Sequence, residues 1–340
     1  MSEHLKILSA GPSMSLQDLG RQGYLAYGLT IGGAADRMAL HEGAALLGQS
    51  GNCAAIEMVG MGGTFEPTKD TCIALTGAPM SATLDGAPLL WHASHKLPAG
   101  AKLVIGGARA GNYGYLHIAG GFDTPIHMGA RASHLNAQIG AFLQSGDTVA
   151  FQREIPARSG YFLSPDDRFN GGTVRIITSF QSTHFSQETR DRFAKTEFTR
   201  DPRGNRQGVR MATKAPGFFA EGGLSIVSEV ITTGDIQVAG DGAPYVLMCE
   251  SQTTGGYPRI GTVIPSDLPK VAQAPVGAPI RFEFISQENA IELEKRARTE
   301  TKALPSRAQP MVRDPQDIAD MLSYQLISGA VSATADPFAS

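Results

Sequence analysis

Residues 250–261 read ESQTTGGYPRIG, a string that offers hydrogen bonds from side chains and backbone at very short spacing. Thr253 and Thr254 carry hydroxyls, and Gly255 and Gly256 leave their backbone N–H groups unshielded. If the two glycines adopt positive φ, these N–H groups form a concave nest of donors. Donors held in this way suit a carbonyl oxygen that gains negative charge in a transition state. The string is therefore a candidate binding loop for a carbonyl compound.

The residues on either side of the threonines and glycines complete this candidate loop. Tyr257 can stack on a flat group, Pro258 fixes the exit of the chain, and Gln252 precedes the threonines. The alternative is a glycine bulge at a barrel corner, in which the threonines satisfy only local backbone groups. The residues alone leave both interpretations open.

A second candidate is the pair of arginines in RQGVRM, Arg206 and Arg210. If this segment is a strand, the two side chains point to one face, because residues four apart share a face. Two guanidinium groups on one face can clamp a carboxylate or a carboxylated intermediate bidentately. The alternative is a pair of surface arginines in salt bridges with Glu229 or Asp235.

Four more charged residues are candidates for supporting roles. Asp18 and Arg21 lie on a glycine-punctuated loop, SLQDLGRQGY, where we expect them to pair with each other or to cap backbone groups. Asp36 precedes a helical pattern, so we interpret it as an early-helix carboxylate rather than a base. Asp267 follows in PSDLP, shortly after the candidate loop.

Several common catalytic patterns are absent from the sequence. There is no G-x-x-x-x-G-K-[ST] and no G-x-G-x-x-G between a strand and a helix, so no nucleotide cradle is recognisable. G-x-S-x-G and HExxH are also missing. His92 and His95 are three residues apart, which places them on opposite faces of a strand, and we predict no metal site.

Composition narrows the class of protein further. The net charge is −3 and no long basic cluster occurs, so the electrostatic footprint of nucleic-acid binding is missing. Cys53, Cys72 and Cys249 are far apart and odd in number, which gives no disulfide framework and favours a reducing cytoplasm. No apolar run approaches the ~18 residues needed to span a bilayer, and no signal peptide is recognisable, so we expect no membrane partner.

The elements that must position these candidates are mostly short strands. Apolar runs of four to eight residues alternate with glycine-rich turns, which predicts a mainly β fold with a few peripheral helices. Helical patterns cover residues 33–48 and 186–198, and a third follows Ser286 as N-cap. Residues 305–310 read as a linker, and a capped helix is predicted to begin at Asp314.

The two halves of the chain also echo each other. DGAP occurs at residues 85–88 and again at 241–244, as a duplicated β unit would produce, although such short echoes also arise by chance. We predict a first β-barrel subdomain over residues 1–157, a second over 158–290 and a helical C-terminal extension over 291–340.

Five stretches, taken in order, resemble the biotin-dependent carboxyltransferase family. They are QDLGR-x-G-Y, GGA-x-D-R, ALTGA, YLHIAGGFDTP, and QTTGGYPRI followed by SDLP. The family includes the C-type subunit of 5-oxoprolinase, allophanate hydrolase subunit 2 and one half of the carboxyltransferase domain of urea carboxylase. The resemblance implies two cyclophilin-like β-barrel subdomains. It also implies a complementary cyclophilin-like subunit, like the B-type subunit of 5-oxoprolinase or allophanate hydrolase subunit 1, with the active site in the cleft between the two.

The resemblance leaves three functions open. The first is a subunit of an ATP-dependent 5-oxoprolinase-type amidohydrolase that opens a lactam or cyclic amide, with a third lactam-hydrolase-type subunit as a further partner. The second is a carboxyltransferase subunit that moves CO2 from carboxybiotin to urea or a related amide. The third is a regulatory module that antagonises a kinase inhibitor. No Met-Lys-Met biotinylation site and no ATP motif occur, so biotin would reside on a separate carrier and ATP is not obviously bound by this chain.

Within this family, the loop at 252–257 is expected to recognise a flat, uncharged amide. The sequence departs from the family pattern nearby, because Asn205-Arg206-Gln207-Gly208 stands where relatives carry Asp-Arg-Met-Gly. The exchange removes a carboxylate and places an amide beside Arg206, so we expect altered substrate preference. The general base is not identified by sequence and is expected from either this chain or its partner.

Overall fold

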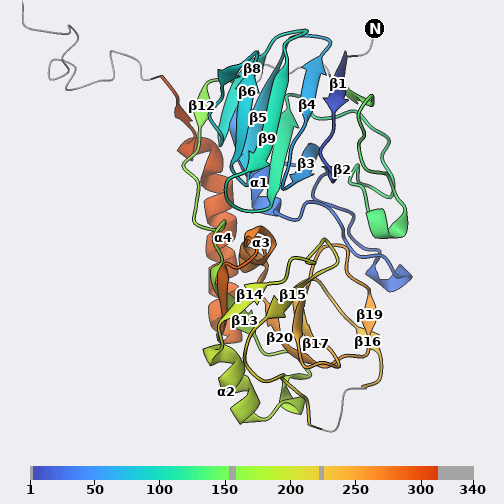
Figure 1. Cartoon of the computed structure of the whole chain (residues 1–340), viewed down its shortest axis with the longest axis vertical. Helices are drawn as coiled ribbons and strands as arrows, with labels where there is room; N and C mark the ends of the chain where they lie inside the picture. Colours follow the sequence, from blue (N-terminus) through green and yellow to red (C-terminus); the bar gives the residue numbers. More distant parts are fainter. Residues whose placement is uncertain (1–2, 153–157, 222–225, 313–340) are drawn as a thin grey trace, which may run out of the picture.

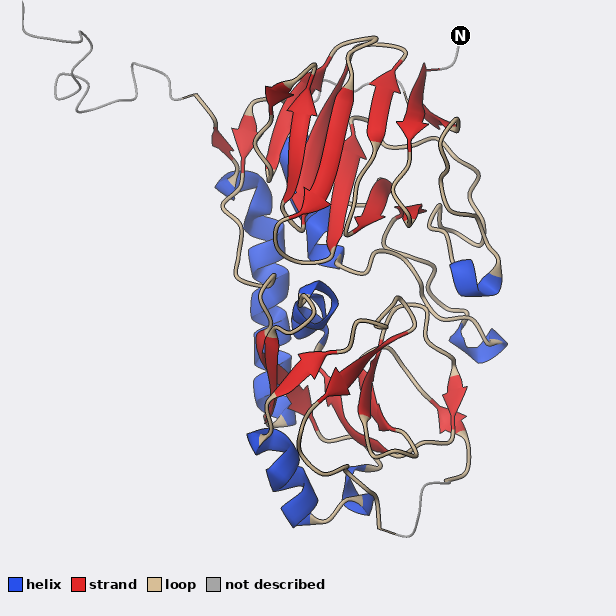
Figure 2. Ribbon diagram, in the orientation of Figure 1, coloured by secondary structure: helices blue, strands red, loops and turns tan. Residues whose placement is uncertain are grey.

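The structure is a computed structural model that describes residues 3–152, 158–221 and 226–312. Two β-rich subdomains are stacked along the long axis of the molecule, and one long helix runs beside both (Figure 1). Strands dominate, with helices mainly at the edges (Figure 2). The predicted mainly β class with peripheral helices is confirmed.

The first subdomain consists of two sheets that enclose an apolar core. Leu5, Phe65, Leu75 and Leu116 are among its fully buried members. One sheet has the order β11-β1-β4-β9-β6-β7 and the other β2-β3-β10-β5-β8-β12-β22. The strands of the first are Thr148–Phe151, Glu3–Ser9, Thr64–Pro67, Leu103–Ala108, Met80–Leu84 and Ala87–Pro88; those of the second are Met14–Gln17, Ala55–Val59, Tyr113–Ile118, Thr71–Gly77, Ala93–Leu97, Tyr161–Phe162 and Gln309–Pro310.

The second subdomain is a closed barrel of seven strands in the order β13-β20-β17-β18-β15-β14-β21. The strands are Gly172–Ile177, Arg259–Val263, Asp235–Val238, Pro244–Leu247, Gly208–Ala212, Phe198–Arg200 and Pro279–Phe284. Ile236 and Val238 belong to the buried core, and residues between them in a strand point the opposite way. Gln237 therefore lies on the outer face of the barrel.

Cross-strand register aligns three outward side chains into one row. Arg210 on β15 is opposite Tyr245 on β18, and Tyr245 is in turn opposite Gln237 on β17. Adjacent strands are about 4.8 Å apart, so the row extends over roughly 10 Å of the barrel's outer surface. This row forms the floor of the candidate site.

Helices begin and end largely where the sequence signals them. Helix α1 covers Arg37–Leu47, with Asp36 as N-cap and Gly48 as a left-handed C-cap. It begins later than residue 33 because Gly33 has φ +77 and lies against the backbone of residues 18–20. Helix α2 covers Gln187–Lys195 and α3 covers Leu268–Gln273.

The prediction of a linker at residues 305–310 is wrong. Helix α4 runs from Gln287 through Pro305 to Arg307, with Ser286 as the predicted N-cap. Leu304 is buried in a cluster that contains Leu46 and Leu47 of α1, and this packing outweighs the local cost of proline. Gln309–Pro310 then forms β22 against β12. The helix predicted from Asp314 lies outside the described residues.

The domain boundaries after residues 157 and 290 stay predictions. Tyr161–Phe162, just beyond the first boundary, forms β12 and pairs with β8 of the first subdomain. Arg168 also joins the two halves, since it donates to Asp36 and Glu42 in α1. Gln273 of α3 donates to the same carboxylate of Asp36.

Candidate functional site

A buried arginine joins the two subdomains beside the candidate loop. Arg206 precedes β15 and donates to Glu250, at 2.7 Å, and to Glu57 of β3. It also donates to the backbone oxygen of Gly33. Arg206 is only 8% exposed, and both carboxylates are buried. Burial alone would lower the pKa of Arg206, but the buried carboxylates around it raise the pKa well above its usual value.

Glu57 links this arginine to the start of α1. It accepts hydrogen bonds from the backbone N–H of Ala35 and from the hydroxyl of Tyr115, at 2.9 and 2.7 Å. Burial and the neighbouring carboxylates raise the pKa of Tyr115, so the phenol stays protonated as a donor. Asp36 is the N-cap of α1 and is held by Arg168, which agrees with its predicted role as an early-helix carboxylate. These residues fix the start of α1 relative to Arg206, beside the candidate loop.

The candidate loop lies along the flank of the barrel. Thr254–Gly255 forms β19, which pairs with β16, Glu229–Val230. The predicted nest is wrong, because neither Gly255 nor Gly256 has positive φ. Pairing with β16 keeps the backbone extended instead.

Glycine at position 255 allows close packing instead. A Cβ there would lie 2.5 Å from Nε2 of Gln237 and 3.1 Å from Cδ1 of Ile231. Real Cβ contacts are essentially never as short as the first of these. Gly255 therefore lets the loop lie directly against Gln237, and the carboxamide is covered by the loop.

A cavity of about 460 Å³ lies between the loop and the row of outward side chains. Tyr245 and Leu247 contribute to its floor, and Tyr257, 48% exposed, lies at its edge. Two polar atoms in this lining have no hydrogen-bond partner among the described residues: Nε2 of Gln237 and Oγ of Ser251. The full lining is Arg203, Asn205, Gln207, Gly208, Arg210, Ile231, Gln237, Ala239, Tyr245, Leu247, Ser251, Gln252 and Tyr257.

A second cavity of about 370 Å³ lies on the other side of the loop, at the junction of the subdomains. Ser251 and Gln252 line both cavities, while Thr253 and Thr254 line only the second. The loop is thus the wall between two cavities. Thr253, which is half-buried, and Thr254, which is exposed, both line this second cavity.

His134 contributes a neutral imidazole to the second cavity. Its Nε2 lies 2.9 Å from the hydroxyl of Thr30, and its Nδ1 accepts the backbone N–H of Ala137. Burial lowers the pKa of His134 despite the nearby Glu250. The Thr30 hydroxyl in turn donates to the backbone oxygen of Ser251.

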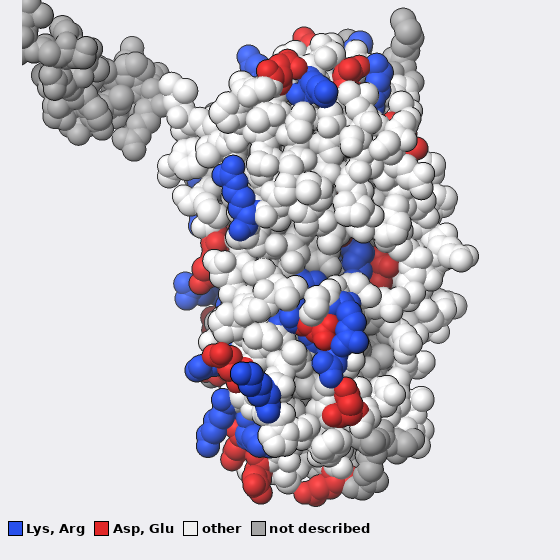
Figure 3. Space-filling model, viewed as in Figure 1, with Lys and Arg blue, Asp and Glu red and all other residues white. Residues whose placement is uncertain are grey.

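The structure does not bring Arg206 and Arg210 together as a clamp. Arg206 is committed to buried carboxylates, whereas Arg210 pairs with Asp241 and Asp201 at 2.8 and 3.5 Å. Figure 3 shows acidic and basic side chains gathered over the part of the barrel that carries β14 and β15. The alternative pairing was also wrong, because Glu229 and Asp235 bind Arg259.

Asp18 and Arg21 have structural partners of their own. Asp18 accepts the backbone N–H groups of Gly20 and Arg131, so of the two expected roles it caps backbone rather than pairing with Arg21. Arg21 is fully buried and donates to the backbone oxygens of Ala132 and His127. Burial lowers the pKa of Arg21, and Asp18 partly offsets this through space.

Asp267 lies away from both cavities. It accepts from the backbone N–H of Arg175 and from its guanidinium at 2.8 and 2.6 Å. Burial would raise the pKa of Asp267, but the hydrogen bonds from Arg175 outweigh it and the pKa is lowered. The residue fixes the connection between β13 and α3.

Asp267→Asn is expected to lower the free energy of unfolding by about 1–3 kcal/mol at pH 7, the usual loss for a charged hydrogen bond. A depressed folded-state pKa stabilises the fold above the unfolded-state value near 3.8. The difference between wild type and variant should therefore be constant above about pH 5 and shrink below about pH 4. Urea unfolding at several pH values measures it; a difference that grows on acidification would contradict this role.

Sequence reasoning missed several residues that line the first cavity. Gln237, Tyr245 and Ser251 became candidates only when the barrel register and the covering loop were known. The alternation in DIQV does place Gln237 opposite the core side chains, which is a usable signal for its outward direction. It carries no information on what covers the side chain.

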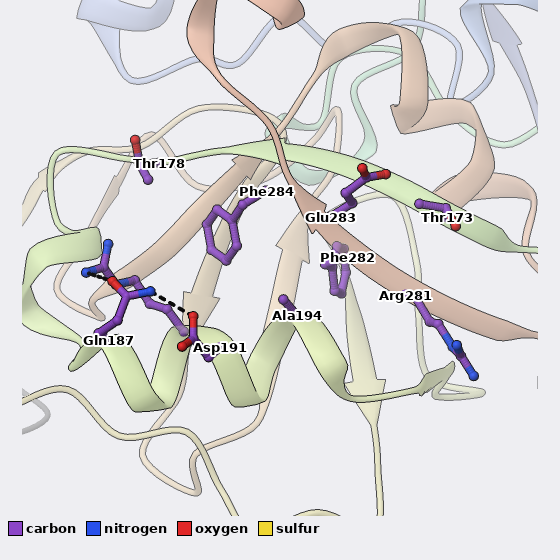
Figure 4. A pocket seen from close by; sticks show the side chains of 10 residues that line it. Thr173, Thr178, Gln187, Asp191, Ala194, Arg281, Phe282, Glu283 and Phe284 are labelled. Atoms are coloured by element: carbon purple, nitrogen blue, oxygen red, sulfur yellow. Dashed lines mark hydrogen bonds between the residues drawn. The ribbon is translucent and has the colours of Figure 1, made fainter.

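A further cavity, of about 540 Å³, is elsewhere. It lies between α2 and β21, with Phe282 and Phe284 among its lining residues (Figure 4). Gln187 and Asp191 at its rim already bond to each other. None of the sequence-predicted site residues lines it.

The described residues contain no group of three or more His, Cys, Asp or Glu side chains placed to hold a metal ion. None of the helices in the described ranges is both long and apolar enough to cross a bilayer. The three cysteines form no disulfide in the described part of the chain.

Comparison with known proteins identifies relatives for most of the chain. The family model described as carboxyltransferase domain, subdomain A and B, matches residues 27–284. The C-type subunit of 5-oxoprolinase from Haemophilus influenzae is 32% identical over 301 residues, which are 86% of this chain and 94% of that protein. Urea amidolyase of Saccharomyces cerevisiae is 26% identical over 88% of this chain but only 18% of its own length. The crystal structure of Kluyveromyces lactis urea amidolyase superposes with a TM-score of 0.80 at 21% identity, covering 92% of this chain and 21% of that one.

Proposed function

The chain belongs to the family of the carboxyltransferase domain, subdomains A and B, and from that premise we propose that it is the amide-binding subunit of a 5-oxoprolinase-type enzyme. The relative from Haemophilus influenzae matches nearly its whole length, whereas urea amidolyase matches over about a fifth. The observation that carries the proposal is the cavity under the loop, whose polar atoms at Gln237 and Ser251 have no partner among the described residues.

Opening a lactam requires groups that bind a flat amide and stabilise an oxyanion. Water adds to the carbonyl carbon, the C–N bond breaks, and a carboxylate and an amine are released. Tyr245 and Tyr257 supply flat apolar surface for the ring, and Ser251 and Gln237 supply donors. Thr253 and Thr254 line the adjoining cavity. We place there the path by which the substrate reaches the first cavity from the partner subunit.

We place a complementary subunit over the loop. Val230, 58% exposed, pairs with Thr254, and Val227 is 87% exposed beside the strand that carries it. Tyr257 adds a third exposed apolar side chain on the loop. Apolar groups next to a polar cavity are typical of protein interfaces. The expected compartment of this complex is the cytoplasm.

The first cavity does not fit ATP. A triphosphate needs several unpaired cations, but Arg203 is held by the buried Asp201, which leaves only the exposed pair of Arg210 and Asp241 open to exchange for a ligand. We therefore assign the nucleotide to a partner subunit and give this chain no part in nucleotide chemistry.

Carboxyl transfer is the second candidate, favoured by the similarity to urea amidolyase. Neutral polar groups such as Gln237 and Ser251 suit urea as well as a lactam, and the biotin would arrive on a separate carrier. The relatives reported above bear enzyme names, so we do not pursue the regulatory alternative.

Co-expression with the complementary subunit tests the proposal. The purified complex should convert 5-oxoproline to glutamate only when ATP is present. Biotin-dependent urea carboxylation without lactam opening would favour the second candidate instead. A tight complex that is inactive in both assays would overturn the proposed function.

Arg210→Met is expected to raise the KM for 5-oxoproline by roughly tenfold or more, the effect of one lost charged hydrogen bond. Asp241 is 54% exposed at its side chain, and exposed ion pairs contribute little, so a substrate carboxylate can replace it on Arg210. Arg281→Met, which breaks an exposed ion pair with Glu197, is the matched control and should leave KM unchanged. An unchanged KM in Arg210→Met would remove this residue from substrate binding.

A further inference from the structure

The side chain of Gln237 combines burial with an unused hydrogen-bonding group. It is 8% exposed, and its Nε2 has no partner among the described residues. Buried polar groups are normally paired, because an unpaired one costs free energy in the folded state. Gln237 lines the cavity under the loop, where Gly255 covers its Nε2, so a ligand in that cavity can supply the partner once the contact with Gly255 opens.

The carboxamide is held in place from two sides. Its backbone lies in β17, between Tyr245 of β18 and Arg259 of β20. Gly255 covers the amide closely enough that a Cβ would be 2.5 Å from Nε2. A group fixed in this way is preorganised for one direction of hydrogen bonding.

A primary carboxamide presents a donor N–H and an acceptor oxygen side by side. A cis-amide, as in a lactam or a cyclic ureide, presents the complementary acceptor and donor along one edge. We propose that Gln237 is the specificity-determining residue of this chain and pairs with the cis-amide edge of the ligand through two parallel hydrogen bonds. The inference rests on the proposed function for placing a lactam in this cavity.

This pairing predicts which compounds are excluded. An N-methyl lactam loses the N–H and brings a methyl group against the oxygen of Gln237. A lactone replaces the N–H with an oxygen, which leaves the carboxamide oxygen facing another acceptor. A site built around a hydrogen-bonding group discriminates strongly against analogues that lack the partner.

Titration of the full chain, followed by ligand-observed NMR, tests the inference. The probes are 2-pyrrolidinone, 2-imidazolidinone, N-methyl-2-pyrrolidinone and γ-butyrolactone. We expect the first two to bind and the last two to bind at least tenfold more weakly. Gln237→Leu should weaken 2-pyrrolidinone at least tenfold, and Gln237→Glu should do the same because it loses the donor at neutral pH.

Gln187→Leu in α2 is the matched control, since it exchanges the same residue types beside the other large cavity (Figure 4). It should leave binding unchanged, and circular dichroism should show that all variants are folded. Tighter binding of 2-pyrrolidinone than of 2-imidazolidinone would indicate that the ligand is a lactam. The reverse order of affinities would indicate a cyclic ureide.

The outcomes separate this inference from the proposed function. Binding that depends on Gln237, in a complex that does not open 5-oxoproline, supports the inference and overturns the function. Turnover of 5-oxoproline with unchanged kcat/KM in Gln237→Leu overturns the inference. Equal binding of 2-pyrrolidinone and its N-methyl analogue overturns it as well.

Discussion

Gly255→Val is expected to lower kcat/KM of the assembled enzyme at least 100-fold while the barrel stays folded. A Cβ at this position is too close to Gln237 and Ile231, so the carboxamide must leave its place or β19 must separate from β16. Either change alters the wall of the cavity. Overpacking of this kind costs about 1–3 kcal/mol, and here it affects the two-stranded sheet of β16 and β19 at the flank of the barrel.

Steady-state kinetics of the co-expressed complex measures the loss of kcat/KM. Thermal unfolding of the variant shows whether the barrel stays folded. Gly107→Val is the control, because a Cβ at Gly107 meets nothing closer than 3.8 Å. Normal turnover by Gly255→Val would remove the loop from the mechanism. Loss of turnover in Gly107→Val as well would attribute the effect to general instability.

Arg206→Met is expected to lower the free energy of unfolding by about 3–5 kcal/mol, the usual loss when one partner of a buried ion pair is removed. The substitution leaves the carboxylates of Glu57 and Glu250 buried without their cation. Because Glu57 belongs to the first subdomain and Arg206 to the second, we also expect the two halves to unfold in separate transitions.

Urea unfolding followed by fluorescence and circular dichroism measures this effect. Arg281→Met is the control, because it breaks only an exposed ion pair worth about 0–1 kcal/mol. Equal losses in the two variants would show that Arg206 does not hold the subdomains together.

Local sequence signals were sufficient for the mainly β class and for the starts of α2 and α4, but not for α3. Ser286 acts as the predicted N-cap, and Gly48, the last residue of the predicted pattern 33–48, is a C-cap, because capping depends on backbone groups within one turn. The linker at 305–310 was predicted wrongly, because Leu304 packs against a helix far away in the sequence. Tertiary packing of this kind is not encoded in a local window.

The candidate site was predictable only in part. The loop at 252–257 was recognised from its residue types, but its glycines serve close packing rather than positive φ. Arg206 was considered as part of an arginine clamp. Its partner Glu57 is 149 residues away in the sequence, so this ion pair could not be predicted from the RQGVRM segment. Gln237 was missed because a strand pattern indicates which way its side chain points. The pattern does not indicate which loop covers that side chain.

The most direct test of the central claim is a crystal structure of the chain, together with its complementary partner, in complex with 5-oxoproline. The lactam ring should lie between Tyr245 and Tyr257, with its cis-amide edge on Gln237. A ligand bound in the α2 cavity of Figure 4, or wholly within the partner subunit, would contradict the assignment of the cavity under the loop.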